Sequence, residues 1–283
     1  MELIMDFLQQ TQNIQQSYIV CSTGRSGSTL LCRTLAQSKL CGNPQEYFHH
    51  RTIKQLGLKG DLEKFKEYCH SILQEGTTSN GVFGIKMHWW QMSEFLKIAK
   101  KIPAFKEKSE LEILNTFFPN PKFVYIWRQD MVAQAVSTTI ALQTDVWEKR
   151  ARDDSYEMTA KAVAPKDGGT KDIEFQPLKI YKWEENFKDQ NKRWLAFLQE
   201  NELNYHEVIN ESLVSDFENK MKAVIEFLEI DGIDENSLKA ATKKQSTSTN
   251  RKFIQRYQQY PKLLLKVVSK IDRQLNKKSK KQA

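Results

Sequence analysis

The fold of this 283-residue chain is decided by one stretch, Tyr18-Ile-Val-Cys-Ser-Thr-Gly-Arg-Ser-Gly-Ser-Thr29, which continues into Leu30 and Leu31. It begins with an apolar run typical of a buried strand, continues with a loop of small hydroxylated residues, and ends in the start of an amphipathic helix. A strand, a tight loop and a helix in this order direct backbone N–H groups and a helix N-terminus toward one point. The stretch therefore predicts an anion site at the end of the strand.

The loop residues suit an anion in different ways. Gly24 and Gly27 allow a tight turn and a close approach of the backbone, and Arg25 adds a planar cation suited to oxyanions. Thr23 opens the loop, and three further residues can donate hydroxyl hydrogen bonds: Ser26, Ser28 and Thr29. The simpler alternative is an ordinary strand–turn–helix with a serine-rich helix cap.

The loop lacks one residue that nucleotide-hydrolysing phosphate loops carry, and this limits the reactions it is expected to support. A nucleotide-hydrolysing phosphate loop carries a lysine directly before its Ser or Thr, and the hydroxyl binds magnesium. Here Gly27 stands before Ser28. The loop is therefore expected to hold a phosphate without the metal-dependent chemistry of triphosphates.

The composition is that of a globular protein with a sizeable core. Hydrophobic residues make up 40% of the chain, which excludes a disordered or fibrous protein. No run approaches the ~18 apolar residues of a membrane span, and residues 1–6 do not resemble a signal peptide. The cysteines show neither CxxC nor zinc-ligand spacing, so a reducing, cytoplasmic setting is expected: Cys21, Cys32, Cys41 and Cys69.

The positive charge is concentrated at one end of the chain. Residues 262–283 hold eight lysines and arginines against one acid, so they carry +7 of the formal net charge of +8. A general nucleic-acid-binding surface is therefore weakly supported. Apolar residues in this segment follow a helical stripe: Leu264, Val268, Ile271 and Leu275. We expect a helix that packs this stripe on the body; a membrane surface or an acidic partner is the alternative.

Strand-like and helix-like patterns alternate along the rest of the chain. Strands are expected at residues 18–22, 82–87, 123–127 and 205–210, and helices at 29–38, 131–142, 185–199 and 217–228. Alternation of this kind predicts an α/β fold, a three-layer parallel sheet with helices on both faces. Because ligands of such sheets bind beyond the carboxyl ends of the strands, the site is expected at that edge.

Charged and aromatic side chains follow the ends of the expected strands. Lys86 and His88 lie on the same side of one strand and leave it together. Arg128 follows the next strand, and Ser137 lies about two turns into the following helix, so both can reach one anion. Glu46 stands beside aromatic residues, which predicts a raised pKa and a general base; a turn carboxylate is the commoner role of a lone glutamate.

Several aromatic residues and one polar segment lie near the expected site. Tyr47, Trp89, Trp90 and Trp147 suit stacking on a sugar ring, although indoles at such positions also serve as core residues. Residues 148–180 form either a solvated surface loop or a lid for the acceptor.

Several segments together resemble the sulfotransferases that use 3′-phosphoadenosine-5′-phosphosulfate (PAPS), specifically the bacterial trehalose 2-sulfotransferase-like family. They occur in the family's order at residues 21–31, 43–48, 81–89, 128–147, 181–194 and 224–229. The resemblance spans roughly residues 17 to 257. It implies a P-loop NTPase-like sulfotransferase fold and PAPS as the co-substrate.

The resemblance also implies a role for individual residues. The loop from Arg25 to Thr29 holds the 5′-phosphosulfate, and Arg128 and Ser137 hold the 3′-phosphate. Lys244 and Arg251 lie in a basic segment with which the family closes over the cofactor phosphates. Two departures stand out: Gly24 replaces the usual proline, and Arg128 is alone where relatives often have two or three arginines.

Two residues are candidates for the base. Glu46 matches the position that is proposed to take the acceptor proton, whereas Lys86-Met-His88 is similar to the Lys-x-His of cytosolic sulfotransferases, in which the histidine is the base. We favour Glu46 because the remaining pattern is of the bacterial type. Since a sulfuryl group carries less charge than a phosphoryl group, no metal is expected, and Arg25 and Lys86 stabilise the leaving oxygen.

The sequence thus predicts a sulfotransferase domain at residues 1–261 and a basic helix and tail at 262–283. The expected acceptor is a hydroxyl of a carbohydrate or glycolipid. No nucleic acid is expected as a partner; contact of the tail with a membrane is an open possibility, and relatives suggest a homodimer. The alternatives are a nucleotide-dependent small-molecule kinase and a non-catalytic membrane or nucleic-acid adaptor.

Overall fold

The computed structural model describes residues 13–147, 173–234, 238–240 and 247–282, with the backbone alone for 276–282. The chain forms two compact units. The first contains the chain up to Gln129 together with Gln190–Ala241, and the second contains Asp130–Asp189 and Thr242–Ala283.

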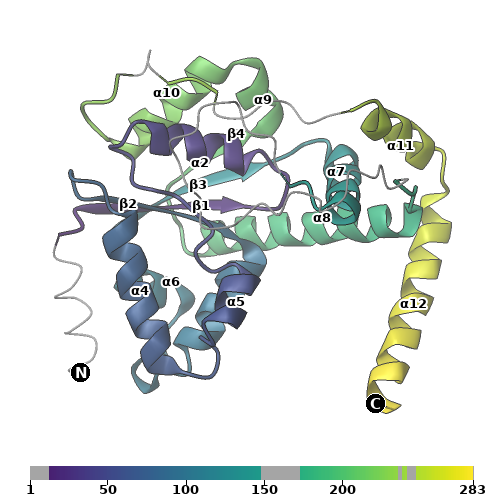
Figure 1. The fold of residues 1–283 in the computed structure, drawn as a ribbon, viewed down its shortest axis with the longest axis horizontal. Coiled ribbons are helices and arrows are strands. Elements are labelled where there is room, and N and C mark those ends of the chain that lie inside the picture. Colours follow the sequence, from purple (N-terminus) through teal and green to yellow (C-terminus); the bar gives the residue numbers. More distant parts are fainter. Residues whose placement is uncertain (1–12, 148–172, 235–237, 241–246, 283) are drawn as a thin grey trace. The chain divides into compact units, whose positions relative to one another are not determined.

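A four-stranded parallel sheet forms the centre of the first unit (Figure 1). Its strands are β1 (Gln16–Ser22), β2 (Val82–His88), β3 (Pro121–Trp127) and β4 (Tyr205–Ile209), in the spatial order β2-β1-β3-β4. Ser22 pairs with His88 in the register of β1 and β2. The ends of these strands therefore bring the loop after β1 beside the residues that follow β2.

Helices cover both faces of this sheet, as Figure 1 shows. On one face, α2 (Ser28–Gln37), α9 (Asn210–Ser215) and α10 (Phe217–Leu228) share a core with Val20 and Ile126. On the other face lie α4 (Leu62–Gly76), α5 (Trp89–Ala99), α6 (Glu110–Phe117) and part of α8 (Pro177–Glu200), around Phe95 and Trp194. The predicted three-layer α/β fold is confirmed.

The second unit is helical. It contains α7 (Met131–Thr144), the first part of α8, α11 (Ser248–Gln258) and α12 (Lys262–Gln282). Its core includes Val136, Ile180 and Tyr257. The expectation of a polar loop up to residue 180 is wrong at its end, because Pro177–Ile180 form the first turn of α8 and Ile180 is buried. Residues 148–172 lie outside the described part of the chain.

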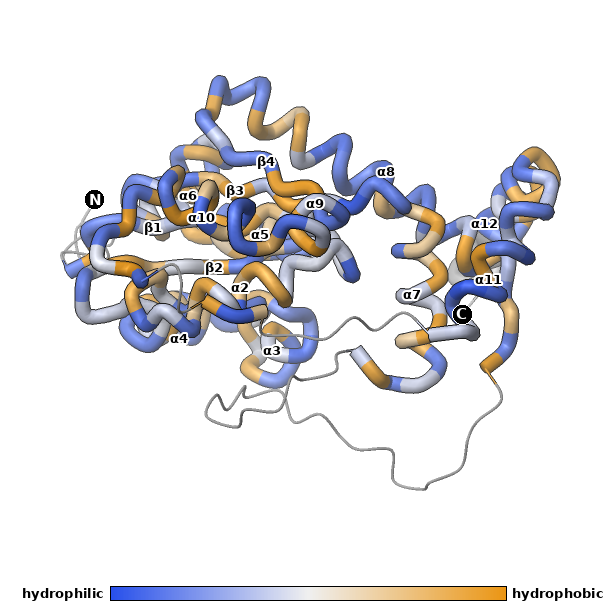
Figure 2. Tube along the Cα trace, turned by 90° about the horizontal axis from the view of Figure 1, so that it is seen from above, coloured by the Kyte–Doolittle hydropathy of each residue, from blue (hydrophilic) through white to orange (hydrophobic). Residues whose placement is uncertain are grey.

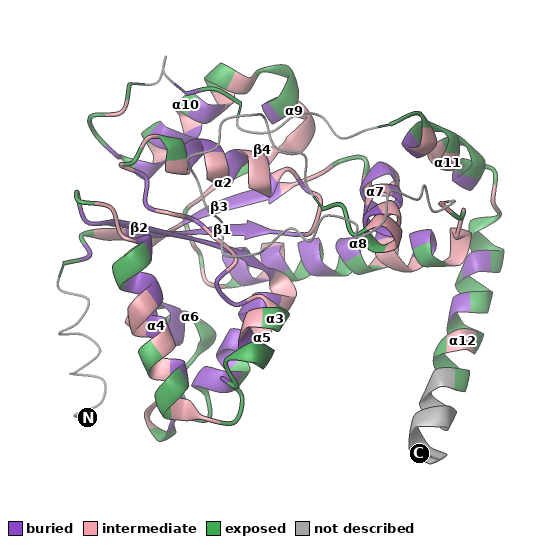
Figure 3. Ribbon diagram, in the orientation of Figure 1, coloured by how far each residue is buried: buried purple, intermediate pink, exposed green. Residues whose placement is uncertain are grey.

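Helix α12 does not pack its apolar stripe as the sequence pattern predicts. Leu264, Val268, Ile271 and Leu275 are all exposed, and much of the helix is green in the burial colouring of Figure 3. Leu265 and Ser269 are buried instead, so a narrower edge of the helix attaches it to its unit. Among the described helices, α12 included, none is both long enough and apolar enough to cross a membrane.

Candidate functional site

The loop between β1 and α2 has a backbone suited to an anion. Arg25 and Gly27 both have positive φ angles, 63° and 87°. The φ angle of position 27 favours glycine, and a Cβ there would also lie 2.1 Å from Oδ1 of Asn210. The Oγ of Ser26 is buried and has no hydrogen-bond partner in the described part of the chain. Because an unpaired buried hydroxyl is costly, a bound oxyanion that accepts from Ser26 would be stabilising.

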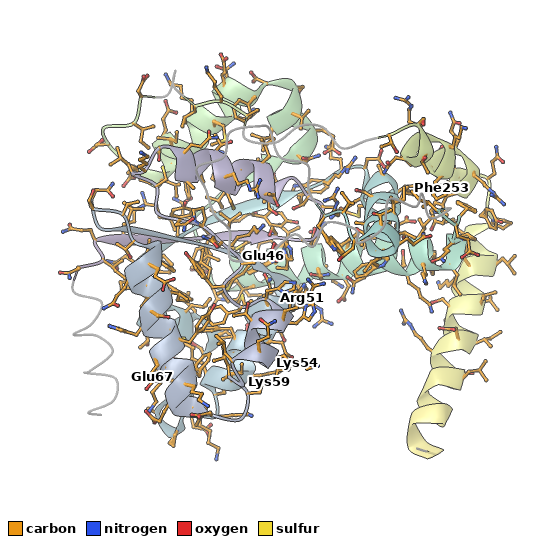
Figure 4. The ribbon with its side chains drawn as sticks, viewed as in Figure 1. Glu46, Arg51, Lys54, Lys59, Glu67 and Phe253 are labelled. Atoms are coloured by element: carbon orange, nitrogen blue, oxygen red, sulfur yellow. The ribbon has the colours of Figure 1, made fainter. Side chains whose placement is uncertain are left out.

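The segment that carries Glu46 runs beside β2 at the same edge of the sheet. Gln45 forms an isolated parallel bridge with Ile85, and the Lys86 N–H donates to the Gln45 carbonyl at 3.0 Å. This pairing places the next residue, Glu46, beside the last residues of β2 (Figure 4). Glu46, which stands alone in the sequence, thus lies at the edge of the sheet.

Glu46 is the centre of a cluster of charged and polar side chains. Its Oε1 lies 2.8 Å from Lys86 Nζ, and its Oε2 lies 3.6 Å from His88 Nε2. Lys86 Nζ also donates to Thr29 Oγ1 at 3.3 Å. The lysine therefore joins the carboxylate to the end of the anion loop.

Gln91, in the first turn of α5, orients both Glu46 and His88. Its Nε2 donates to Glu46 Oε2 at 2.8 Å, and its Oε1 accepts from the backbone N–H of His88 at 2.7 Å. Gln91 is fully buried. Sequence reasoning missed this residue because it treated the segment after His88 as a strand end, whereas a helix begins at Trp89.

The electrostatics of the cluster correct the expectation of a raised pKa for Glu46. Burial opposes its ionisation, but the charges of Lys86 and His88 and the hydrogen bonds from Lys86 and Gln91 hold the pKa of Glu46 well below its usual range. Burial also lowers the pKa of His88 to about 4, although the neighbouring carboxylate opposes this shift. At neutral pH the cluster thus holds an ionised Glu46 and a neutral His88.

These pKa directions give a direct prediction for His88. Because its pKa lies near 4, the imidazole should stay neutral from about pH 8 down to about pH 5. Since the Glu46 carboxylate raises that pKa, Glu46→Gln should move the titration to still lower pH. Histidine NMR titration of the wild-type chain and of Glu46→Gln measures both pKa values, with His88→Asn to assign the resonance. A midpoint near pH 6.5 for His88 in the wild-type chain would contradict its burial beside Glu46 and Lys86.

Arg128 follows β3 and is held by an acidic residue. Its Nε lies 3.4 Å from Oε1 of Glu211, and the other oxygen of Glu211 accepts from the Gln129 N–H at 3.0 Å. Glu211 lies in the first turn of α9, which starts where β4 ends. The guanidinium is thus oriented at the carboxyl edge of the sheet.

The aromatic candidates divide into core residues and rim residues. Trp89 makes an edge contact with Trp194 at 5.1 Å between ring centroids. Tyr47 is buried, and its hydroxyl donates to the Asn43 carbonyl at 2.7 Å. Both side chains therefore contribute to packing. Trp90 instead lies with two imidazoles, those of His49 and His50, each 5.8 Å away between ring centroids.

Comparison with known proteins agrees with this geometry. The family model described as Stf0 sulphotransferase matches residues 17–260, which is most of the chain. The chain belongs to the Stf0 sulphotransferase family.

Two curated relatives are similar to part of the chain. The trehalose 2-sulfotransferase of Mycolicibacterium smegmatis is 31% identical over 176 residues, which cover 52% of this chain and 66% of that protein. The trehalose 2-sulfotransferase of Mycobacterium tuberculosis is 31% identical over 156 residues, which cover 46% of this chain and 58% of that protein. The matched regions thus span less than two thirds of each relative.

The remaining candidates from the sequence lie in the second unit or outside the described residues. Ser137 lies in α7 and Arg251 in α11. Trp147 is exposed, and its Nε1 donates to Asp145 Oδ1 at 3.1 Å. Lys244 lies outside the described part of the chain. The roles of these residues in an Stf0 enzyme stay predictions.

Asn191 is a further polar residue that sequence reasoning missed. Its side chain is buried, and neither its Oδ1 nor its Nδ2 has a hydrogen-bond partner in the part of the chain that the structure describes. Asn191 lies one helical turn before Trp194, whose Nε1 donates to the Ser22 carbonyl at 3.0 Å. Helix α8 thus contacts the carboxyl end of β1 through Trp194, and only the three-dimensional structure reveals that the Asn191 amide is buried without a partner among the described residues.

Proposed function

We propose that this chain transfers the sulfuryl group of PAPS to a hydroxyl of a carbohydrate or glycolipid. The observation that carries the proposal is the position of Lys86, which bonds both to Glu46 and to Thr29 of the anion loop. A base and a cation thus lie next to the loop that would hold the donor. Family membership and the similarity to two trehalose 2-sulfotransferases support the same reaction.

Two groups of residues at the edge of the sheet are proposed to bind the phosphates of the donor. The loop amides, Arg25 and the unpaired hydroxyl of Ser26 would bind the 5′-phosphosulfate. Arg128 would bind the 3′-phosphate through its guanidinium. The assignment of Ser137, Lys244 and Arg251 to the donor phosphates rests on the family resemblance.

In the proposed reaction the acceptor oxygen attacks sulfur in line. A new S–O bond forms, the bond from sulfur to the bridging oxygen of the 5′-phosphate breaks, and the acceptor proton passes to Glu46. Arg25 and Lys86 stabilise the negative charge that develops on the bridging oxygen. As Lys86 turns toward that oxygen, Glu46 loses its closest cation and becomes a stronger base in the same step.

Exposure favours Glu46 over His88 as the base. The Glu46 side chain is 28% exposed and that of His88 is 10% exposed. Both ring nitrogens of His88 also have neighbours, Ser22 Oγ at 2.9 Å and Glu46 Oε2 at 3.6 Å. A carboxylate has more acceptor sites than an imidazole, so Glu46 keeps room for an acceptor hydroxyl.

Transfer of radiolabelled sulfuryl from PAPS tests the proposal. The full chain is incubated with labelled PAPS and a series of sugars that begins with trehalose, without added metal. We expect label in a sugar sulfate together with release of 3′-phosphoadenosine-5′-phosphate (PAP). Magnesium-dependent consumption of ATP, with no response to PAPS, would instead establish a kinase.

Asn191 is proposed to bind the acceptor, because both polar atoms of its buried amide lack a partner among the described residues and can bond to sugar hydroxyls. Asn191→Ala is expected to raise the KM for the acceptor by up to about tenfold, the value of one or two hydrogen bonds. PAP affinity should stay unchanged. Lys192→Ala, an exposed neighbour on the same helix, is the matched control. An unchanged KM in Asn191→Ala would refute this role.

A further inference from the structure

Helix α12 exposes an unusually large apolar face. Six aliphatic residues on this helix are between 38% and 75% exposed: Leu263, Leu264, Val267, Val268, Ile271 and Leu275. Single exposed aliphatic residues are normal on protein surfaces, but a contiguous apolar face marks an interaction site. Figure 2 shows the apolar residues of α12 in orange between blue polar ones.

The exposed face is separate from the edge that attaches the helix to its unit. At 100° per residue, the six residues span an arc of about 140°. The neighbouring arc holds Leu265 and Ser269, which are buried, and Asp272, which forms an ion pair with Lys182. Attachment through this narrow edge therefore leaves the apolar arc uncovered.

Basic residues occupy the remaining side of the helix. Lys266, Lys270 and Arg273 are exposed. Lys262, at the start of the helix, instead donates a hydrogen bond to Glu184 at 2.6 Å and lies over the Tyr257 ring. At 100° per residue, Lys277 and Lys280 continue this side further along α12, whereas Lys278 and Lys281 fall within the arc of the apolar residues, beyond Leu275. A cationic face thus adjoins an apolar one.

We propose that α12 binds the surface of an anionic lipid bilayer. A helix with an apolar arc, a lysine-rich polar face and low mean hydropathy lies in the interface plane, with its apolar side chains at the acyl boundary. Anionic headgroups attract the lysines and the arginine. A bilayer of this charge therefore matches both faces of the helix at once.

A second copy of the chain fits the helix less well. Two copies would bring together two segments that each carry +7, and like charges repel. Charge thus favours the anionic lipid surface over a second copy.

Co-sedimentation of the full chain with vesicles tests the proposal. Binding is expected to vesicles of phosphatidylcholine mixed with phosphatidylglycerol, and to be at least about tenfold weaker with phosphatidylcholine alone or in high salt. Val268→Asp with Ile271→Asp should reduce binding at least about tenfold as well. Val214→Asp, at another exposed valine, is the matched control and should bind normally.

A second set of variants separates the two faces. Lys266→Glu, Lys270→Glu and Arg273→Glu together should abolish the preference for anionic vesicles while the apolar face stays intact. Equal sedimentation of the control and the α12 variants would overturn the proposal. So would a dimer in analytical ultracentrifugation that Val268→Asp dissociates, if the wild-type chain does not bind vesicles. Circular dichroism confirms that each variant is folded.

Discussion

Replacing Glu46 with glutamine is expected to lower sulfuryl transfer about 100- to 10,000-fold, the usual contribution of a general base. Glutamine keeps the size and the hydrogen bond to Gln91 but cannot take a proton from the acceptor. PAP affinity should be unchanged or slightly higher, because Lys86 loses its partner at 2.8 Å and can bind the donor instead. Steady-state kinetics together with calorimetry of PAP binding measure both effects.

His88→Asn is the matched comparison for the base. Asparagine can keep the contact with Ser22, so the loss should be limited to a few-fold if the histidine only orients the cluster. A large loss in His88→Asn with normal turnover in Glu46→Gln would reverse the assignment. Such a result would make this site resemble the Lys-x-His arrangement of cytosolic sulfotransferases.

Replacing Arg128 with alanine is expected to remove the preference for PAP over AMP. A charged hydrogen bond contributes about 1.5–3 kcal/mol, so PAP affinity should fall about 10- to 100-fold. AMP has no 3′-phosphate, and its affinity should therefore be unaffected, which makes it an internal control. Calorimetric titration of the wild-type chain and of Arg128→Ala with both nucleotides gives the four affinities.

Two further variants sharpen the Arg128 result. Glu211→Gln removes the charge that lies 3.4 Å from the guanidinium and should strengthen PAP binding modestly. Arg51→Ala, at an exposed arginine of α3 (His50–Gln55), should change neither affinity. An equal loss of PAP and AMP binding in Arg128→Ala would place the arginine elsewhere than at the 3′-phosphate.

The sheet could be predicted from the sequence because each strand is a local signal. Apolar runs at residues 18–22, 82–87, 123–127 and 205–210 are the four strands within two residues at each end. Helices α4, α5 and α6 were not expected, although their residues fill one face of the core. Their helical patterns follow directly on strands or polar turns, where strand and helix periods are hard to separate.

Some residues of the cluster around Glu46 could be named from the sequence, but their contacts and electrostatics could not. Glu46, Lys86 and Gln91 come from three separate segments, and only their contacts show why the pKa of Glu46 is low rather than raised. Asn191 is one polar residue among many in α8, and its burial without a partner is a property of packing. Likewise, the apolar residues of α12 have the same helical spacing whether that face is covered or exposed to solvent, so the sequence does not distinguish the two cases.

Calorimetric titration of the wild-type chain with PAP, AMP and ATP tests the central claim, a donor site for two phosphates without a metal. We predict that PAP binds at least about tenfold more tightly than AMP, and that magnesium does not strengthen the binding of ATP. Equal affinities for PAP and AMP, or tight binding of ATP only with magnesium, would contradict a sulfotransferase donor site.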